Sequence, residues 1–107
     1  MPTALRPRRE LAGLGEAELV ELARQGNETA IRLLIERNNQ RLFRAARSVL
    51  RNDGEAEDVV QQTYVKAFTA LASFRGEASF STWLTRIALN EAVSRLRRRK
   101  ASSELEA

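Results

Sequence analysis

The sequence predicts an all-α protein, a compact three-helix bundle preceded by a short N-terminal helix, and two observations lead to this prediction. Apolar residues recur at intervals of three and four over most of the chain, and no stretch alternates between apolar and polar residues as a strand does. Glycine, asparagine, aspartate and serine separate the periodic segments, where helices begin and end. With 107 residues there is room for one domain and one modest core.

The N-terminal residues come before the first clear helical pattern. Residues 1–15 contain both prolines and two of the five glycines, so we expect a flexible lead-in with a short helical turn. The first helix is predicted at EAELVELARQ, residues 16–25, where Leu19, Leu22 and Ala23 recur at helical spacing. Gly26 follows and is positioned to end this helix in a left-handed conformation.

Asn27 is positioned to cap a second, longer helix that runs to about Leu50. One face of this helix is apolar and comprises Ile31, Leu34, Ile35, Leu42, Ala45, Ala46 and Val49. The opposite face is basic and comprises Arg32, Arg37, Arg41, Arg44 and Arg47.

Two more helices are predicted after the turn RNDG. Asp53 is a good N-cap for the third, EAEDVVQQTYVKAFTALASF, whose expected core positions are Ala56, Val59, Val60, Thr63, Ala67, Phe68 and Leu71. The periodicity breaks at RGEAS and resumes in a fourth helix that Ser79 or Ser81 can cap and that ends near Lys100, with expected core positions Phe80, Trp83, Leu84, Ile87, Ala88 and Leu96. The last residues, ASSELEA, are small and polar, and they indicate the start of a linker.

Composition argues against catalysis. The chain contains neither cysteine nor histidine, which removes thiol chemistry, thiolate metal sites and the commonest general base. The sequence also lacks a phosphate-cradling glycine loop and a Ser/His/Asp set, so we expect no enzyme, metal site or cofactor. Because no apolar run approaches the roughly 20 residues that span a bilayer, and the N-terminus lacks a secretory signal, we expect a cytoplasmic protein without a membrane partner.

The charges divide into two groups along the chain. The net charge of +4 and the pI near 10.6 are compatible with a polyanionic partner. A basic run near the end of the fourth helix comprises Arg95, Arg97, Arg98, Arg99 and Lys100, and a separate acidic patch comprises Glu55, Glu57 and Asp58. Two surfaces of opposite sign suggest two different partners. In the simpler alternative, the basic run offsets the helix dipole and is otherwise a solvated face.

The stretch SFRGEASFSTWLTRIALN holds the most specific signal for nucleic acid. Phe74 and Phe80 lie on either side of a small-residue turn, which can hold an unstacked base between apolar side chains. The alternative is that both rings are core plugs, and for Phe80 and Trp83 we expect this core role. Asn90 lies next to the apolar stripe, where its amide can read a base edge or serve as a structural, helix-bending residue.

The start of the third helix suggests a protein partner. Asp58, Gln61 and Gln62 form a polar stripe on which a partner helix can dock, although the acidic residues there can also be no more than a helix cap.

The combination GEAEDVVQQTYVKAFTALASFRGEASFSTWLTRIALNEAVSRLRRR resembles domain 2 of bacterial RNA polymerase sigma factors of the extracytoplasmic-function (ECF) group. In that family an acidic turn with DVVQ, an aromatic-basic helix, an FRG loop, an FSTWL helix start and an asparagine occur in this order. The resemblance spans residues 16–100. We therefore expect a single sigma domain 2 there, with residues 1–15 as its lead-in and residues 101–107 as the start of an interdomain linker, the second DNA-binding domain being absent.

The resemblance implies which residues meet each partner. The β′ clamp helices of core polymerase would contact Arg41, Asp58, Gln61 and Gln62. The loop would capture a base flipped out of the minus-ten non-template strand, Asn90 would read a neighbouring position, and the basic run would hold phosphates. The DNA-binding set so implied is Ser73, Phe74, Arg75, Gly76, Glu77, Ala78, Ser79, Arg86, Asn90, Arg95, Arg97, Arg98, Arg99 and Lys100.

The function implied is that of an alternative sigma factor domain, which binds RNA polymerase core and recognises and helps to open the minus-ten promoter element as single-stranded DNA. Because Arg86 and Ile87 stand where primary sigma factors carry adjacent tryptophans, opening should depend on a good promoter match. An anti-sigma factor is a further expected partner, and the free domain should be a monomer.

Two rival functions make different predictions. A sigma-like decoy would bind an anti-sigma factor without binding DNA, and the basic run argues against it because a decoy needs no phosphate contacts. A general basic nucleic-acid binder would show affinity that follows salt alone.

Overall fold

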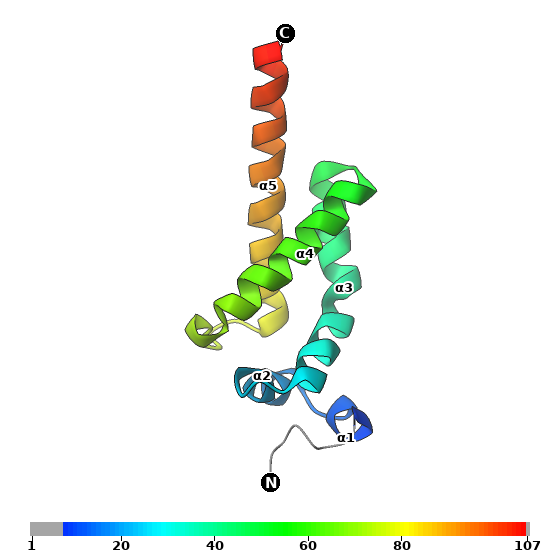
Figure 1. The fold of residues 1–107 in the computed structure, drawn as a ribbon, viewed down its shortest axis with the longest axis vertical. Helices are drawn as coiled ribbons and strands as arrows, with labels where there is room; N and C mark the ends of the chain where they lie inside the picture. Colours follow the sequence, from blue (N-terminus) through cyan, green and yellow to red (C-terminus); the bar gives the residue numbers. More distant parts are fainter. Residues whose placement is uncertain (1–7, 107) are drawn as a thin grey trace.

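The computed structural model of the protein describes residues 8–106, and within this range every regular element is helical (Figure 1). The elements are α1 (Arg8–Ala12), α2 (Glu16–Arg24), α3 (Glu28–Leu50), α4 (Asp53–Thr69), the 3₁₀ helix η2 (Leu71–Ser73) and α5 (Phe80–Glu106). The prediction of an all-α bundle of three principal helices with a short helix before them is confirmed. None of the described helices is long and apolar enough to cross a membrane.

The core lies where α3, α4 and α5 pack against one another in all three pairs. In Figure 1, α4 runs obliquely across the space between α3 and α5, and α2 lies across the lower end of the bundle. Leu42 of α3, Val59 of α4 and Leu84 of α5 are all completely buried there. Ala88 and Ala92 are also fully buried, because their small side chains let α5 approach its neighbours closely.

Most of the helix ends follow the signals in the sequence. Gly26 follows α2 in a left-handed conformation with a φ of 85°, as predicted. The Asn27 N–H donates to the Leu22 carbonyl at 3.0 Å and completes the end of this helix. Asn27 then caps α3, its side chain accepting from the Ala30 N–H at 3.0 Å. Ser79 caps α5 by accepting from the Thr82 N–H at 3.1 Å.

The predicted cap of α4 is wrong by one residue. Asn52, not Asp53, is the N-cap, and its side-chain oxygen accepts from the Glu55 N–H at 2.8 Å. Asp53 is the first helical residue, and its carboxylate accepts instead from Nε of Arg47 at 2.7 Å. Both residue types cap well, so the sequence alone did not separate them.

The lead-in expected at residues 1–15 contains a short helix, in line with the helical turn predicted there. Its first seven residues lie outside the described residues, but α1 follows at once and packs on α3. Leu11 is completely buried, and Nη2 of Arg37 donates to the Ala12 carbonyl at 2.8 Å. A five-residue helix with one buried leucine has too little periodicity to show in the sequence.

The fourth predicted helix is longer than expected. It was predicted to end near Lys100, but α5 continues to Glu106 because alanine, leucine and glutamate in the tail are good helix formers. Residues 97–106 are all exposed, and Figure 1 shows the end of α5 projecting past the other helices. This projection accounts for the long axis of a molecule measuring 61 × 24 × 19 Å. That residues 101–107 begin a linker stays a prediction.

Candidate nucleic-acid interface

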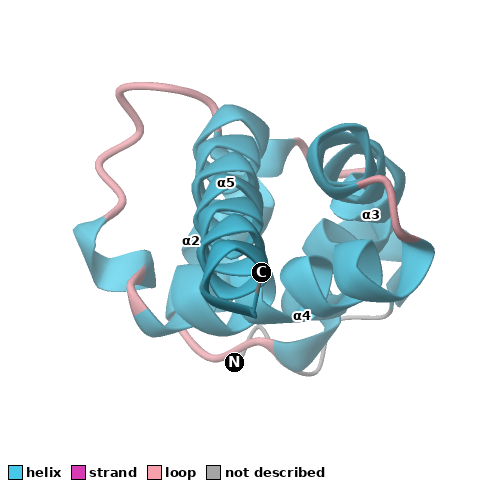
Figure 2. Ribbon diagram, turned by 90° about the horizontal axis from the view of Figure 1, so that it is seen from above, coloured by secondary structure: helices cyan, strands magenta, loops and turns pink. Residues whose placement is uncertain are grey.

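A cavity of about 330 Å³ lies at the end of the bundle, between the loop that follows η2 and the first turns of α5. Figure 2 shows this loop extending away from the helices on the side of α2 and α5. The volume is at the small end of the range for small-ligand pockets. The lining residues are Ser73, Phe74, Arg75, Gly76, Glu77, Ala78, Trp83 and Arg86. The structure therefore gathers the predicted loop residues around one cavity, except Ser79, which caps α5 instead.

Aromatic rings form one side of this cavity. The Phe74 ring lies 4.9 Å from the Trp83 ring and 5.7 Å from the Phe80 ring, measured between centroids. Phe80 is only 2% exposed, so its predicted core role is confirmed. Trp83, expected in the core, is partly exposed and lines the cavity beside Phe74. The Phe74 and Trp83 rings are tilted by 39° to each other, and aromatic rings that border a cavity are surfaces on which an unstacked base can stack.

Gly76 gives the loop its turn. Its φ of +77° is a conformation that L side chains rarely adopt, although a Cβ built there would meet nothing within 4 Å. The glycine is therefore required by the backbone and not by a close neighbour.

Arg24, at the end of α2, holds the start of the loop, and the sequence analysis missed it. Its Nη1 donates to the Leu71 carbonyl at 2.7 Å and its Nη2 to the Phe74 carbonyl at 2.5 Å. The guanidinium carbon also lies 5.8 Å from the centroid of the Phe74 ring. No local pattern connects residues 50 positions apart, so nothing in the sequence signalled this contact.

Asn90 was expected next to the apolar stripe of its helix, where an amide needs a partner. It is exposed, and its side chain makes no hydrogen bond to any of the residues that the structure describes. Arg86, which borders the cavity, precedes it by four positions, so the two side chains share one face of α5. Asn90 is thus free to contact a ligand that extends from the cavity along α5.

The basic run and the acidic patch are not separate surfaces, which corrects the prediction. Arg99 pairs with Glu55 and also donates to the Leu50 carbonyl, and Arg95 lies 3.8 Å from an oxygen of Asp58. These contacts join α5 to the start of α4. Only two of the five cations in the run, Arg97 and Lys100, are without an ion pair among the described residues.

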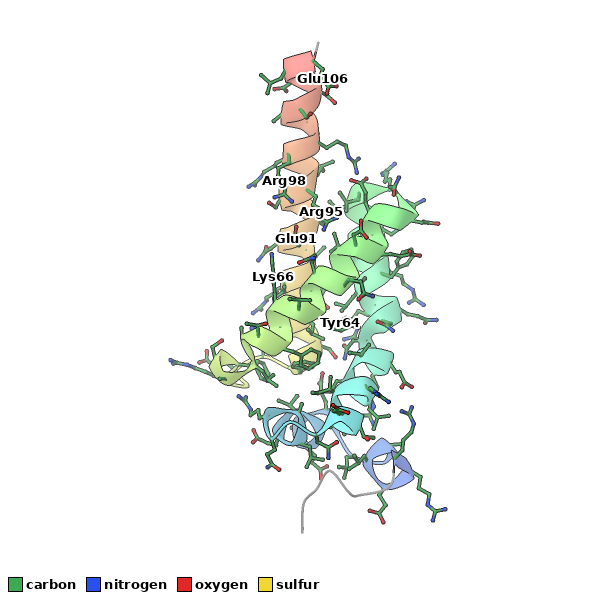
Figure 3. All side chains as sticks on the ribbon, in the orientation of Figure 1. Tyr64, Lys66, Glu91, Arg95, Arg98 and Glu106 are labelled. Carbon is green, nitrogen blue, oxygen red and sulfur yellow. The ribbon has the colours of Figure 1, made fainter. Side chains whose placement is uncertain are left out.

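Glu91 of α5 pairs with three cations, Lys66, Arg95 and Arg98 (Figure 3). Its side chain, 11% exposed, accepts from Nζ of Lys66 at 2.5 Å and from Arg95 and Arg98 at 3.3 Å each. The hydrogen bond from Lys66 is the main reason why the pKa of Glu91 lies below its ordinary value, and the two arginines add to it. Arg98 and Arg95 are therefore partly neutralised within the domain.

The residues assigned to the polymerase contact, Arg41, Asp58, Gln61 and Gln62, are all exposed. Of these, only Gln61 borders the shallow cavity of about 210 Å³ between α3 and α4, together with Asn39, Phe43, Glu57 and Val60. Asp58 points toward Arg95 instead. Phe43 was missed because it lies between the apolar and basic faces of its helix.

Tyr64 joins α3 and α4 beneath this cavity. It is 7% exposed, and its hydroxyl lies 2.7 Å from Oδ1 of Asn39 and 3.0 Å from the Ile35 carbonyl. Burial raises the pKa of Tyr64 to about 12. Figure 3 shows Tyr64 pointing from α4 toward α3. The described residues include no cluster of acidic side chains that could hold a metal ion.

The chain resembles known sigma factors. Residues 34–102 match the family model described as Sigma-70 region 2. The ECF RNA polymerase sigma-E factor of Haemophilus influenzae is 44% identical over 84 residues, which cover 78% of this chain and 43% of that protein. The sigma-E factor of Escherichia coli K12 is 38% identical over 97 residues, covering 88% of this chain and 50% of that protein. The chain thus spans about half the length of these curated relatives.

A solved structure shares the fold. The NMR structure of an engineered region 2 of sigmaE in complex with GTAAAA matches with a TM-score of 0.74 and 36% identity, covering 81% of this chain and 90% of that chain. The family model matches more than half of the chain, and the two sigma-E factors named above are ECF sigma factors. The chain therefore belongs to the Sigma-70 region 2 family, among the ECF sigma factors.

Proposed function

We propose that this chain is the part of an alternative sigma factor that binds RNA polymerase core and recognises the minus-ten promoter element as single-stranded non-template DNA. The observation that carries this proposal is the cavity enclosed by residues 73–78, Trp83 and Arg86, in a fold whose solved relative is bound to GTAAAA. The domain acts by binding alone and catalyses no reaction. In the cell it would work in the cytoplasm, where it meets polymerase.

The cavity suggests how a flipped base would be held. Phe74 and Trp83 offer apolar surface on which a base can stack, which contributes about 1–3 kcal/mol per base. The main-chain groups of the loop can then read the edge of that base. Arg86 and Asn90 extend the same face of α5 toward the next nucleotide, and Arg97 and Lys100 are available for phosphates.

The face formed by α3 and α4 fits the polymerase. Phe43, Val60 and Gln61 border a shallow groove that can accept a helix such as the β′ clamp helices. Arg41, Asp58 and Gln62 are exposed on the same two helices and would contribute polar contacts. An anti-sigma factor would inhibit by covering this face or the loop, and the free domain would be a monomer.

Strand and sequence preference test the proposal. The domain should bind a GTAAAA strand at least tenfold more tightly than a scrambled strand or the duplex, because each mismatched base typically costs about 1–3 kcal/mol. Phe74→Leu and Asn90→Ala should reduce this preference, as measured by fluorescence anisotropy. Phe43→Leu is the matched control, since Phe43 lies away from the cavity. Equal affinity of the unmodified domain for matched and scrambled strands would show that it does not read the element.

A further inference from the structure

The loop that encloses the cavity is tied at both of its ends to one short helix, α2. We propose that α2 is a brace that positions the base-capturing loop, with Arg24 as the positioning residue for Phe74 and Glu16 as its counterpart at the start of α5. This inference rests on the proposed function and assigns a role to residues outside the segment 34–102 that the family model matches.

Arg24 holds the beginning of the loop through two of its nitrogens, and its third nitrogen bonds to its own helix. Nη1 and Nη2 donate to the carbonyls of Leu71 and Phe74, the first residue of η2 and the residue that follows it. Nε donates to Oε1 of Glu21 at 3.1 Å, one turn back on α2. The guanidinium is thus fixed in orientation by its own helix while it holds two points of the loop.

The same guanidinium fixes the ring that faces the base. It lies 5.8 Å from the Phe74 centroid, within the range of a cation–π contact. Phe74 therefore contacts Arg24 of α2 together with Phe80 and Trp83 of α5. The bond to the Leu71 carbonyl is partly buried, whereas the bond to the Phe74 carbonyl lies at the surface.

Glu16 holds the other end. Its Oε1 accepts from the Ser81 N–H at 2.7 Å, and the Ser81 hydroxyl lies 2.7 Å from the same oxygen. Glu16 is the first residue of α2 and Arg24 is the last. The nine residues of α2 therefore span the loop from the backbone before its turn to the helix that follows it. A loop held in its binding conformation loses less entropy when it captures a base.

Arginine suits this position better than lysine. A planar guanidinium donates along several fixed directions at once, whereas an ammonium is a point charge on a flexible stem. Arg24→Lys should therefore keep the charge but lose the simultaneous bonds to both carbonyls. The effect of Arg24→Lys on binding should therefore lie between that of the native arginine and that of Arg24→Met.

The experiment measures affinity for GTAAAA and for a scrambled strand at several salt concentrations. Arg24→Met should weaken binding to the matched strand about tenfold, the cost of losing charge-assisted bonds that preorganise the loop, and leave the scrambled strand within about twofold. Arg24→Lys and Glu16→Gln should give intermediate losses. Amide hydrogen exchange at residues 74–79 should become faster in all three variants.

Arg37→Met is the matched control. Arg37 also donates to a backbone carbonyl, that of Ala12, but it ties α1 to α3 away from the cavity. This variant should lower the unfolding temperature without changing the ratio of matched to scrambled affinity.

The results distinguish a failure of the proposed function from a failure of the bracing role of α2. If the unmodified domain does not distinguish the two strands, the proposed function fails. If it does, and folded Arg24→Met distinguishes them equally well, the bracing role is overturned. A smaller salt dependence in Arg24→Met would also overturn it, because that change indicates a lost phosphate contact. Should Arg24→Met not fold, Arg24→Lys and Glu16→Gln decide by the same criteria.

Discussion

Glu91 is the residue on which the charges of α4 and α5 converge. It lies at a position where its carboxylate is mostly buried and receives hydrogen bonds from one lysine and two arginines. A carboxylate in such a place is stabilising only while it is ionised, because the protonated form accepts these bonds poorly. The domain's stability should therefore depend on the ionisation of this residue.

Replacing Glu91 by glutamine tests this dependence. The pKa of Glu91 is lower in the folded state than in the unfolded chain, so its contribution is complete above the ordinary carboxyl pKa and is lost as the pH falls through the folded value. We expect Glu91→Gln to lower the free energy of unfolding by about 1–2 kcal/mol at pH 7. The difference from the unmodified domain should shrink below about pH 4, as measured by thermal unfolding.

Glu57→Gln is the control for this prediction. Glu57 is exposed and makes no ion pair within the described part of the chain, so its removal should change stability little at any pH. If the free energies of unfolding of Glu91→Gln and of the unmodified domain differed by the same amount from pH 7 to pH 3, stability would not depend on the ionisation of Glu91.

Single residues could be predicted from the sequence where their role is local. Gly26, Asn27 and Ser79 act on backbone groups within a few positions of themselves. Gly26 and Asn27 were assigned correctly, and Ser79 was one of the two caps considered for α5. Arg24 acts across 50 positions, so no local pattern indicated its role. Asn90 was expected next to the apolar stripe and is exposed, because such a stripe defines the buried face only to within about one position.

At the scale of the elements, the start of α4 offers a test between two neighbouring residues. Asn52→Ala removes the side-chain oxygen that accepts from the Glu55 N–H and should cost about 1 kcal/mol. Asp53→Ala removes an exposed ion pair with Arg47 and should cost less, about 0.5 kcal/mol or below. Chemical denaturation measures the loss of unfolding free energy in each variant. If Asp53→Ala proved the more damaging change, the capping role would belong to Asp53.

The long helices and α2 could be predicted because each buries a continuous stripe of apolar residues, and α2 was expected at residues 16–25 and is found at Glu16–Arg24. The bounds of α1 could not be predicted, because this helix depends on the burial of Leu11 against α3. The extent of α5 beyond Lys100 reflects the helical preference of its residues rather than any packing, since that part is exposed. The contacts of α2 with the loop around the cavity could not be predicted either, because they join residues far apart in the chain.

At the scale of the whole molecule, charge is divided between structure and recognition. Arg95 and Arg99 join α5 to α4, and Arg98 pairs with Glu91 on its own helix. Arg97 and Lys100 lie on the exposed part of α5 without an ion pair among the described residues. The basic run that looked uniform in the sequence therefore contains cations of two kinds.

The two kinds of cation should differ in the salt dependence of DNA binding. Replacing Arg97 and Lys100 together by glutamine should lower the slope of log affinity against log salt by about 1.4, because each phosphate contact to a single strand contributes about 0.7. The ratio of matched to scrambled affinity should not change, since phosphate contacts carry no sequence information. Fluorescence anisotropy from 50 to about 300 mM salt spans the range in which such slopes are measured.

Arg99→Gln completes the comparison. Because Arg99 pairs with Glu55 and donates to the Leu50 carbonyl, its loss should lower the unfolding temperature and change the salt slope less than the loss of Arg97 and Lys100 does. If Arg99→Gln changed the slope by a full phosphate contact and left stability intact, the ion pair with Glu55 would have to open when DNA binds. The end of α5 would then exchange an internal partner for a phosphate, and the start of α4, which we propose as part of the polymerase-binding face, would lose its ion pair with Arg99.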